Sequence, residues 1–193
     1  MIVHDALAEL FAYPGDGGRE RILAALRALP DELQNKLSPF TAFVEAHTST
    51  ELEEAYTRTF DINPVCTLEV GWHLYGEDYG RGAFLVQMRE RMRDLRLPEK
   101  TELPDHITCV LEVLGRINAA EIFARSQVVP AVNKMIEGFK RADDPYRTVV
   151  VALRDWLREQ YGQETPAPAA MVPEPYGSIC GSCGIAEGGK VDG

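Results

Sequence analysis

The apolar residues of this 193-residue chain recur every three or four positions in nearly every segment. The clearest run follows Thr101, where the apolar side chains fall at i, i+3, i+4, i+7 and i+10: Ile107, Val110, Leu111, Leu114 and Ile117. This period matches the α-helix and not the alternation of a β-strand, so it predicts a helix with one apolar stripe.

The same period predicts helices over most of the chain. Pro39 and Pro130 fall inside two of these patterns and predict a bend or break, because proline removes a helical hydrogen bond. The run 148–153 has strand propensity, but its flanks and its period favour helix. The apolar stripes of the predicted helices span 3–11, 22–29, 31–44, 52–60, 84–95, 107–117, 122–139 and 146–157.

Two helix starts carry capping signals. Thr50 and Glu53 have the spacing of a capping box, with Thr50 as the N-cap. Asp144 before Pro145 predicts an N-cap followed by proline at the first helical position. Together with the helical period, these signals predict an all-α, single-domain helical bundle.

Two regions depart from the helical pattern. Residues 61–82 contain Gly71, Gly76, Gly80 and Gly82 among acidic and aromatic residues, which predicts a glycine-rich hinge region. Residues 163–193 are rich in proline and glycine and poor in large apolar residues, which predicts a flexible C-terminal tail. The expected organisation is a helical domain over 1–162 and a tail over 163–193.

Charge and composition exclude several classes of function. The net charge is −10 and the pI about 4.9, which argues against nucleic acid as a partner because phosphate binding needs a basic face. No apolar run reaches the roughly 20 residues of a membrane span, and the N-terminus lacks the basic region of a signal peptide. Four cysteines in a chain of this length do not suggest a disulfide framework. We therefore expect a reduced, cytoplasmic protein without direct membrane insertion.

The sequence contains no recognisable catalytic constellation and predicts a binding protein rather than an enzyme. Its most obvious chemical motif is the CxxC of Cys180 and Cys183, which has the spacing of two metal ligands or of a redox couple. A second CxxC is missing, so a metal-binding or thiol redox protein is the alternative function. His106 and Cys109, at i and i+3, make a weaker metal pair.

The strongest apolar stripe is preceded directly by Pro104, Asp105 and His106. Pro104 suits a first helical turn, where Asp105 would lie beside the positive end of the helix dipole and His106 would resist protonation. Two interpretations remain open: Asp105 only caps its helix, or Asp105 and His106 form a polar lip beside an apolar groove.

Several segments together resemble a known family. They are 56–61 (Tyr-Thr-Arg-Thr-Phe-Asp), 74–82 (Leu-Tyr-Gly-Glu-Asp-Tyr-Gly-Arg-Gly), and 102–106 (Glu-Leu-Pro-Asp-His) followed by Leu111-Glu112-x-Leu114. With the N-terminal Leu10 to Pro14, the likeness covers about residues 1–160. In this order and spacing they resemble the delta-subunit type of assembly chaperone for respiratory nitrate reductase. That type lies within the wider family that matures molybdenum oxidoreductases.

This resemblance implies a cytoplasmic chaperone that is not an enzyme and needs no cofactor of its own. Its partner would be the catalytic (alpha) subunit of a molybdenum oxidoreductase, first of all nitrate reductase, bound through an N-terminal twin-arginine-like peptide. The chaperone would hold the apoenzyme until the molybdenum cofactor is inserted. The resemblance leaves the exact client open and does not explain the CxxC. The client-binding residues that it implies are Pro104, Asp105 and His106, then Tyr56, Phe60, Trp72, Glu77 and Arg81.

Overall fold

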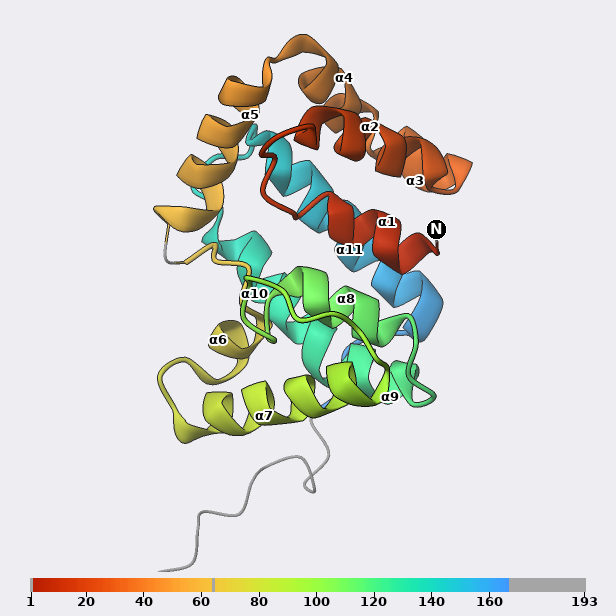
Figure 1. Cartoon of the computed structure of the whole chain (residues 1–193), viewed down its shortest axis with the longest axis vertical. Coiled ribbons are helices and arrows are strands. Elements are labelled where there is room, and N and C mark those ends of the chain that lie inside the picture. Colours follow the sequence, from red (N-terminus) through yellow and green to blue (C-terminus); the bar gives the residue numbers. More distant parts are fainter. Residues whose placement is uncertain (1, 64, 167–193) are drawn as a thin grey trace, which may run out of the picture.

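The computed structural model describes residues 2–63 and 65–166, and these residues form a bundle of helices (Figure 1). The β-type pairing in this described part is limited to an isolated antiparallel bridge between Glu69 and His106. The predicted all-α, single-domain class is confirmed.

The first half of the chain forms the upper part of the molecule in Figure 1. It contains α1 (Val3–Glu9), α2 (Gly18–Ala28), α3 (Asp31–Lys36), α4 (Ser38–Ala46) and α5 (Ser49–Tyr56). The helix of α5 continues into one π-helical turn, η1 (Thr57–Asp61). The chain breaks between α3 and α4 at Leu37, beside Pro39, as the sequence predicted.

The second half begins with α6 (Val70–Tyr75), α7 (Tyr79–Asp94) and α8 (Ile107–Leu114). It continues through α9 (Ala120–Phe123), the π-helical η2 (Ala124–Val128) and α10 (Val129–Gly138). Pro130 lies in the first turn of α10, directly after η2. Because proline cannot donate the hydrogen bond that a continuous α-helix needs there, the predicted interruption takes the form of a π-helical turn.

The last helix, α11 (Pro145–Tyr161), joins the two halves. It packs against α3 and α4 from the first half and against η2 and α10 from the second. The first helix also crosses this division, since α1 packs on α8 (Figure 1). His4 Nε2 lies 2.6 Å from the Tyr161 hydroxyl, so the first helix is bonded to the end of the last.

The core lies between these helices, and α8 is its most buried element. All residues of α8 except Glu112 are buried, which agrees with its strong apolar stripe. An aromatic cluster fills the first half, where Phe40 and Phe60 pack against Tyr146 with ring centroids 5.3 and 4.9 Å apart.

One of the two predicted caps is confirmed and the other is wrong. Asp144 caps α11 by accepting a hydrogen bond from the backbone N–H of Tyr146 at 3.0 Å. The capping box of α5 uses Thr48 and Glu51 instead of Thr50 and Glu53. Both pairs have the required spacing, and Thr48 is the one with the extended backbone that an N-cap needs.

The glycine-rich region contains α6 and the start of α7, and two of its glycines have clear structural reasons. At Gly76 the backbone has φ +59°, a conformation that favours glycine. At Gly71 a Cβ would lie 2.7 Å from Asp105 Oδ2 and 2.9 Å from Phe84 Cδ1, so only glycine fits without a shift. The hinge motion itself stays a prediction.

The first residues of the predicted tail are bonded to the helical body. Arg125 donates to the Gln163 carbonyl at 2.9 Å, and its own carbonyl accepts from the Thr165 N–H at 3.1 Å. Residues 167–193, with Cys180 and Cys183, lie outside the described residues. The division at residue 162 therefore remains a prediction.

Candidate functional site

A buried ion pair joins α7 to the segment before α8. Arg81, in the first turns of α7, donates from Nε to Oδ2 of Asp105 at 3.0 Å. Asp105 is 0% exposed, and the Arg81 side chain is mostly buried. The Arg81 guanidinium also lies over the indole ring of Trp72 in α6, 5.6 Å from its centre. The pair therefore holds α6, α7 and the approach to α8 in one arrangement.

The backbone of this segment is fixed as well. The Asp105 carbonyl accepts from the Val70 N–H at 2.8 Å, and the Ile107 N–H donates to the Leu68 carbonyl at 2.8 Å. Oδ1 of Asp105 is buried without a hydrogen-bond partner among the described residues. Because a buried carboxylate is costly unless it is paired, Asp105 depends on Arg81.

These bonds correct the predicted position of the motif. α8 begins at Ile107, so Pro104 and Asp105 precede the helix and His106 is the N-cap. Asp105 neither caps the helix nor lies on an exposed lip. The short bridge to Glu69 holds residue 106 in an extended conformation, and this pairing delays the helix that the apolar stripe predicts.

His106 is buried and neutral. Its Nδ1 accepts from the Thr108 N–H at 3.3 Å and lies 2.9 Å from the Thr108 hydroxyl. Burial, with a smaller contribution from Lys100, lowers the pKa of His106 to about 4. The predicted resistance to protonation is confirmed, with burial as the main cause. Because Nδ1 accepts, the ring proton resides on Nε2, which has no partner among the described residues.

His106 lines a small pocket between α1 and α8. The pocket has a volume of about 120 Å³, and its lining includes Tyr13, Glu9 and Glu102. Glu9 is paired with Arg21 at 2.9 Å, whereas Glu102 is exposed and has no ion pair within the described part of the chain. Lys100 also lines the pocket but is paired with Glu112 at 2.7 Å, so the groups left for a ligand include the Nε2–H of His106 and the carboxylate of Glu102.

Further carboxylates surround Tyr56 beside this pocket. Burial and the nearby charges of Asp61, Glu102 and Glu69 raise the pKa of the Tyr56 hydroxyl. Burial also raises the pKa of Glu69, and the negative charge of Asp105 adds to the rise. These carboxylates come from η1, from the residue before α6 and from the segment before α8, so three separate segments meet here.

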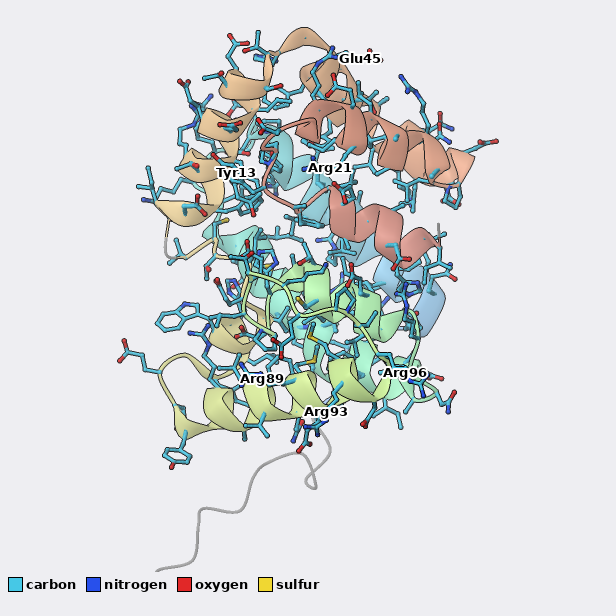
Figure 2. All side chains as sticks on the ribbon, in the orientation of Figure 1. Tyr13, Arg21, Glu45, Arg89, Arg93 and Arg96 are labelled. Atoms are coloured by element: carbon cyan, nitrogen blue, oxygen red, sulfur yellow. The ribbon has the colours of Figure 1, made fainter. Side chains whose placement is uncertain are left out.

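Exposed apolar side chains stand next to these carboxylates in the chain. Ile62 follows Asp61 and is 73% exposed, and Leu103 follows Glu102 and is about half exposed. Tyr13 is also exposed, and desolvation and Glu53, with a smaller contribution from Asp61, raise the pKa of its hydroxyl. Figure 2 shows Tyr13 on the loop after α1, facing α5. We call this surface the acidic face: Asp61, Glu69 and Glu102 with Tyr13, Ile62 and Leu103.

A wider hollow of about 570 Å³ lies between α6 and α10. Trp72 and the exposed Val65 contribute its apolar lining, and Lys134 and Lys140 contribute positive charge. Lys134 also donates to the His73 carbonyl at 2.6 Å, which ties α10 to α6.

The structure brings some of the predicted site residues together and separates others. Arg81, Asp105 and Trp72 form one cluster, with Pro104 and His106 on either side of Asp105 in the chain. Tyr56 and Phe60 belong to the aromatic core, where the Tyr56 hydroxyl donates to the Phe11 carbonyl at 3.1 Å. Glu77 is exposed in the turn between α6 and α7 and makes no ion pair with the described residues.

Sequence reasoning missed Tyr13, Ile62 and Leu103, the apolar residues of the acidic face. Each lies outside the predicted helical stripes, where a single apolar residue is common and carries no signal of its own. Gly71 was named only as a member of the predicted glycine-rich region, and its spacing did not indicate the close approach to Asp105.

The described residues also show what the site lacks. They contain no group of three or more His, Cys, Asp or Glu side chains placed to hold a metal ion. None of the helices in this part of the chain is long and apolar enough to cross a membrane.

Comparison with protein families decides the wider assignment. The sequence model described as nitrate reductase delta subunit matches residues 26–161. The chain belongs to the nitrate reductase delta subunit family. This family consists of assembly chaperones for nitrate reductase, which mature an enzyme and are not themselves catalytic. A search of curated proteins found no match.

The resemblance drawn from the sequence motifs is therefore confirmed. The span matched by the delta subunit family contains the Arg81–Asp105 pair, His106 and the carboxylates of the acidic face. Tyr13 and α1, which complete the pocket at His106, precede that span.

Proposed function

We propose that this chain is a cytoplasmic, non-catalytic chaperone that binds the N-terminal, twin-arginine-like peptide of the nitrate reductase catalytic subunit. It holds the apoenzyme until the molybdenum cofactor is inserted. The family membership supports the assembly role. The observation that carries the binding proposal is the acidic face, where unpaired carboxylates alternate with exposed apolar side chains beside the His106 pocket.

A basic, partly apolar peptide complements this surface. Its arginines would pair with Glu102 and Asp61, and its apolar residues would cover Ile62 and Leu103. Exposed ion pairs contribute only about 0–1 kcal/mol each, so charge mainly sets orientation and association rate. Burial of apolar area contributes about 25 cal/mol per Å² and supplies most of the affinity.

His106 has a defined part in this proposal. Its Nε2–H is the free donor of a neutral ring that lines the pocket, and a peptide carbonyl is a matching acceptor. A neutral donor suits a site for a cationic peptide, because a protonated ring would repel the arginines.

The other predicted residues support this surface. The Arg81–Asp105 pair fixes the segment that carries Glu102 and Leu103, and Pro104 connects that segment to the pair. Tyr56 and Phe60 form the core beneath the acidic face. Trp72 extends the apolar area towards the hollow at α10, and Glu77 supplies a further exposed carboxylate.

The test uses calorimetric titration with the N-terminal peptide of the cognate catalytic subunit. Glu102→Gln combined with Leu103→Ala should weaken binding by about tenfold or more, the equivalent of 1.4 kcal/mol. Glu45→Gln is the matched control, since Glu45 is exposed at the far end of α4 (Figure 2) and its side chain makes no ion pair with the described residues.

A peptide with its arginines replaced by glutamine completes the design. The loss caused by Glu102→Gln should shrink with this peptide, because the two changes remove the same interaction. If Glu102→Gln weakens the binding of both peptides equally, or if the Glu102 and Glu45 variants bind the peptide equally well, the peptide binds at another surface. Peptides from catalytic subunits of related molybdenum enzymes, titrated in parallel, identify the client.

A further inference from the structure

Three arginines follow the outer side of α7 at i, i+4 and i+7. Arg89, Arg93 and Arg96 are all exposed, and Figure 2 shows them along the lower edge of the molecule. The opposite side of α7 is anchored by Phe84, Met88 and Met92, which are buried in the core. Arg89 and Arg93 are therefore carried on a fixed helix, and Arg96 follows directly after the helix end. We call the three residues the arginine stripe.

The arginine stripe is unpaired. None of its members has an ion pair or hydrogen bond from its side chain to any described residue, although the chain as a whole carries a net charge of −10. Asp94 falls on the other flank of α7, whereas Glu90, four residues after Val86 and three before Arg93, shares the outer side with them and makes no ion pair with the described residues. Arg91 has a separate role, because its guanidinium carbon lies 4.5 Å from the centre of the Phe123 ring. The stripe is thus a local positive surface on an acidic protein.

Arg96 occupies a position that usually belongs to glycine. Its φ is +54°, so its backbone is left-handed. Two bonds close the end of α7 around it: the Arg96 N–H donates to the Arg93 carbonyl at 3.0 Å, and the Leu97 N–H donates to the Met92 carbonyl at 2.9 Å. This is a Schellman motif, in which glycine is preferred because a side chain is strained there. Strain of this kind is typical of positions selected for function.

The outward side of α7 continues beyond the arginines as an apolar strip. Val86 is 56% exposed and Tyr79 is 85% exposed, and both follow the stripe at helical spacing. Read from the C-terminal end, the pattern is three cations, then one aliphatic and one aromatic side chain. A second helix laid antiparallel on α7 would match it with carboxylates at i, i+3 and i+7 and apolar residues at i+10 and i+17.

We propose that the arginine stripe, with Val86 and Tyr79, is a docking surface for an acidic α-helical segment of a partner protein. It uses no residue of the acidic face, so it stands independently of the peptide-binding proposal. Nucleic acid is disfavoured, since three arginines neutralise few phosphates and the rest of the chain repels them. An anionic membrane is disfavoured because surface helices bind through a large apolar face and several basic residues.

The test uses a labelled helical peptide of about 20 residues with glutamates and leucines at the complementary positions above. The matched peptide carries glutamines in place of the glutamates. Fluorescence anisotropy with the full chain should show binding of the glutamate peptide that weakens as salt is added. The glutamine peptide should bind much more weakly.

Variants locate the contact. The combined Arg89→Gln, Arg93→Gln and Arg96→Gln variant should bind the glutamate peptide at least about tenfold more weakly, because three charge pairs are lost. Arg93→Gln alone should weaken binding more than Arg27→Gln, a control with the same change of charge at an exposed position on α2.

Arg96→Gly separates binding from folding. It should weaken peptide binding while its thermal midpoint is at least as high as that of the unchanged chain, because glycine relieves the left-handed strain. A lower midpoint would assign Arg96 to folding and overturn its part in the proposal. Equal binding of the two peptides, or of the Arg93 and Arg27 variants, would overturn the docking surface. A different outcome is that the full chain binds phosphatidylglycerol vesicles and not the glutamate peptide. If the triple variant then loses the vesicle binding, the arginine stripe binds a membrane and not a protein.

Discussion

Asp105 is the residue on which the site most depends, because its carboxylate is fully buried and Arg81 is its only ion-pair partner among the described residues. A buried pair of this kind contributes little net stability relative to an apolar pair, but losing one partner leaves an uncompensated charge. The local structure therefore depends on both members together.

Removing one partner of this pair should destabilise the protein strongly. Arg81→Met should lower the free energy of unfolding by roughly 3–5 kcal/mol, as measured by urea denaturation. The combined Arg81→Met and Asp105→Leu variant should recover much of that loss, because no buried charge remains. A single variant that loses less than about 1 kcal/mol would show that water reaches Asp105.

Protonation of His106 should make stability depend on pH. The folded-state pKa of about 4 lies below the ordinary value of 6.5, so the unfolded chain binds the proton more readily. Stability is therefore fully present above about pH 6.5 and falls as the pH drops towards 4, by up to about 3 kcal/mol from this group.

His106→Asn isolates that contribution. Asparagine also accepts a hydrogen bond at an N-cap but does not titrate. Urea denaturation from pH 4 to 7 should show a smaller loss of stability in this variant than in the unchanged chain. The remaining slope includes His4 and His73, whose pKa values are also lowered by burial. Parallel curves for the two proteins would contradict the assignment.

Among the elements, α5 shows how a cap decides where a helix begins. Thr48 accepts from the Glu51 N–H at 3.4 Å, and Glu51 accepts from the Thr48 N–H at 2.8 Å. Thr50 is already inside the helix. The two threonines therefore have different energetic roles although they are two residues apart.

Substitution of these threonines should separate their roles. Thr48→Ala should lower the free energy of unfolding by about 1 kcal/mol, whereas Thr50→Ala should change it by less than about 0.5 kcal/mol. Thermal or urea denaturation of the two variants gives the comparison. A larger loss in Thr50→Ala would place the helix start at the position that the sequence alone suggested.

The same elements show what a sequence can predict. The apolar period was sufficient to find the helices, because burying one stripe of a helix needs only local spacing. It failed at Asp105 and His106, where a non-local bridge to Glu69 replaces the first helical turn. The apolar period could not predict the acidic face either, because the residues of that face come from separate segments that meet only after folding. The resemblance named Arg81 and Asp105 separately as client-binding residues and did not predict that they pair with each other.

At the scale of the whole molecule, the boundary of the helical body lies close to Arg125 and the residues bonded to it. A chain ending at Pro166 retains Gln163 and Thr165, whereas one ending at Gly162 loses both bonds to Arg125. These bonds are partly exposed, so each contributes little stability on its own.

Truncation tests the predicted domain and tail. The chain ending at Pro166 should keep its helical circular dichroism and its thermal midpoint, and the chain ending at Gly162 should melt slightly lower. Metal analysis of the full chain, purified without added metal, should find much less than one zinc or iron per chain. A stoichiometric metal that is lost on truncation would instead favour the alternative role for Cys180 and Cys183.

The contact between the first and last helices has a consequence during synthesis. α1 is synthesised before α8 and α11, yet its apolar side packs on α8, and His4 bonds to Tyr161. At about 5–20 residues per second, α8 is completed roughly 5–20 s after Leu7, Leu10 and Phe11, which it covers. A protein whose family assembles an unfinished enzyme thus passes through an unfinished stage of its own, in which α1 is not yet covered by α8.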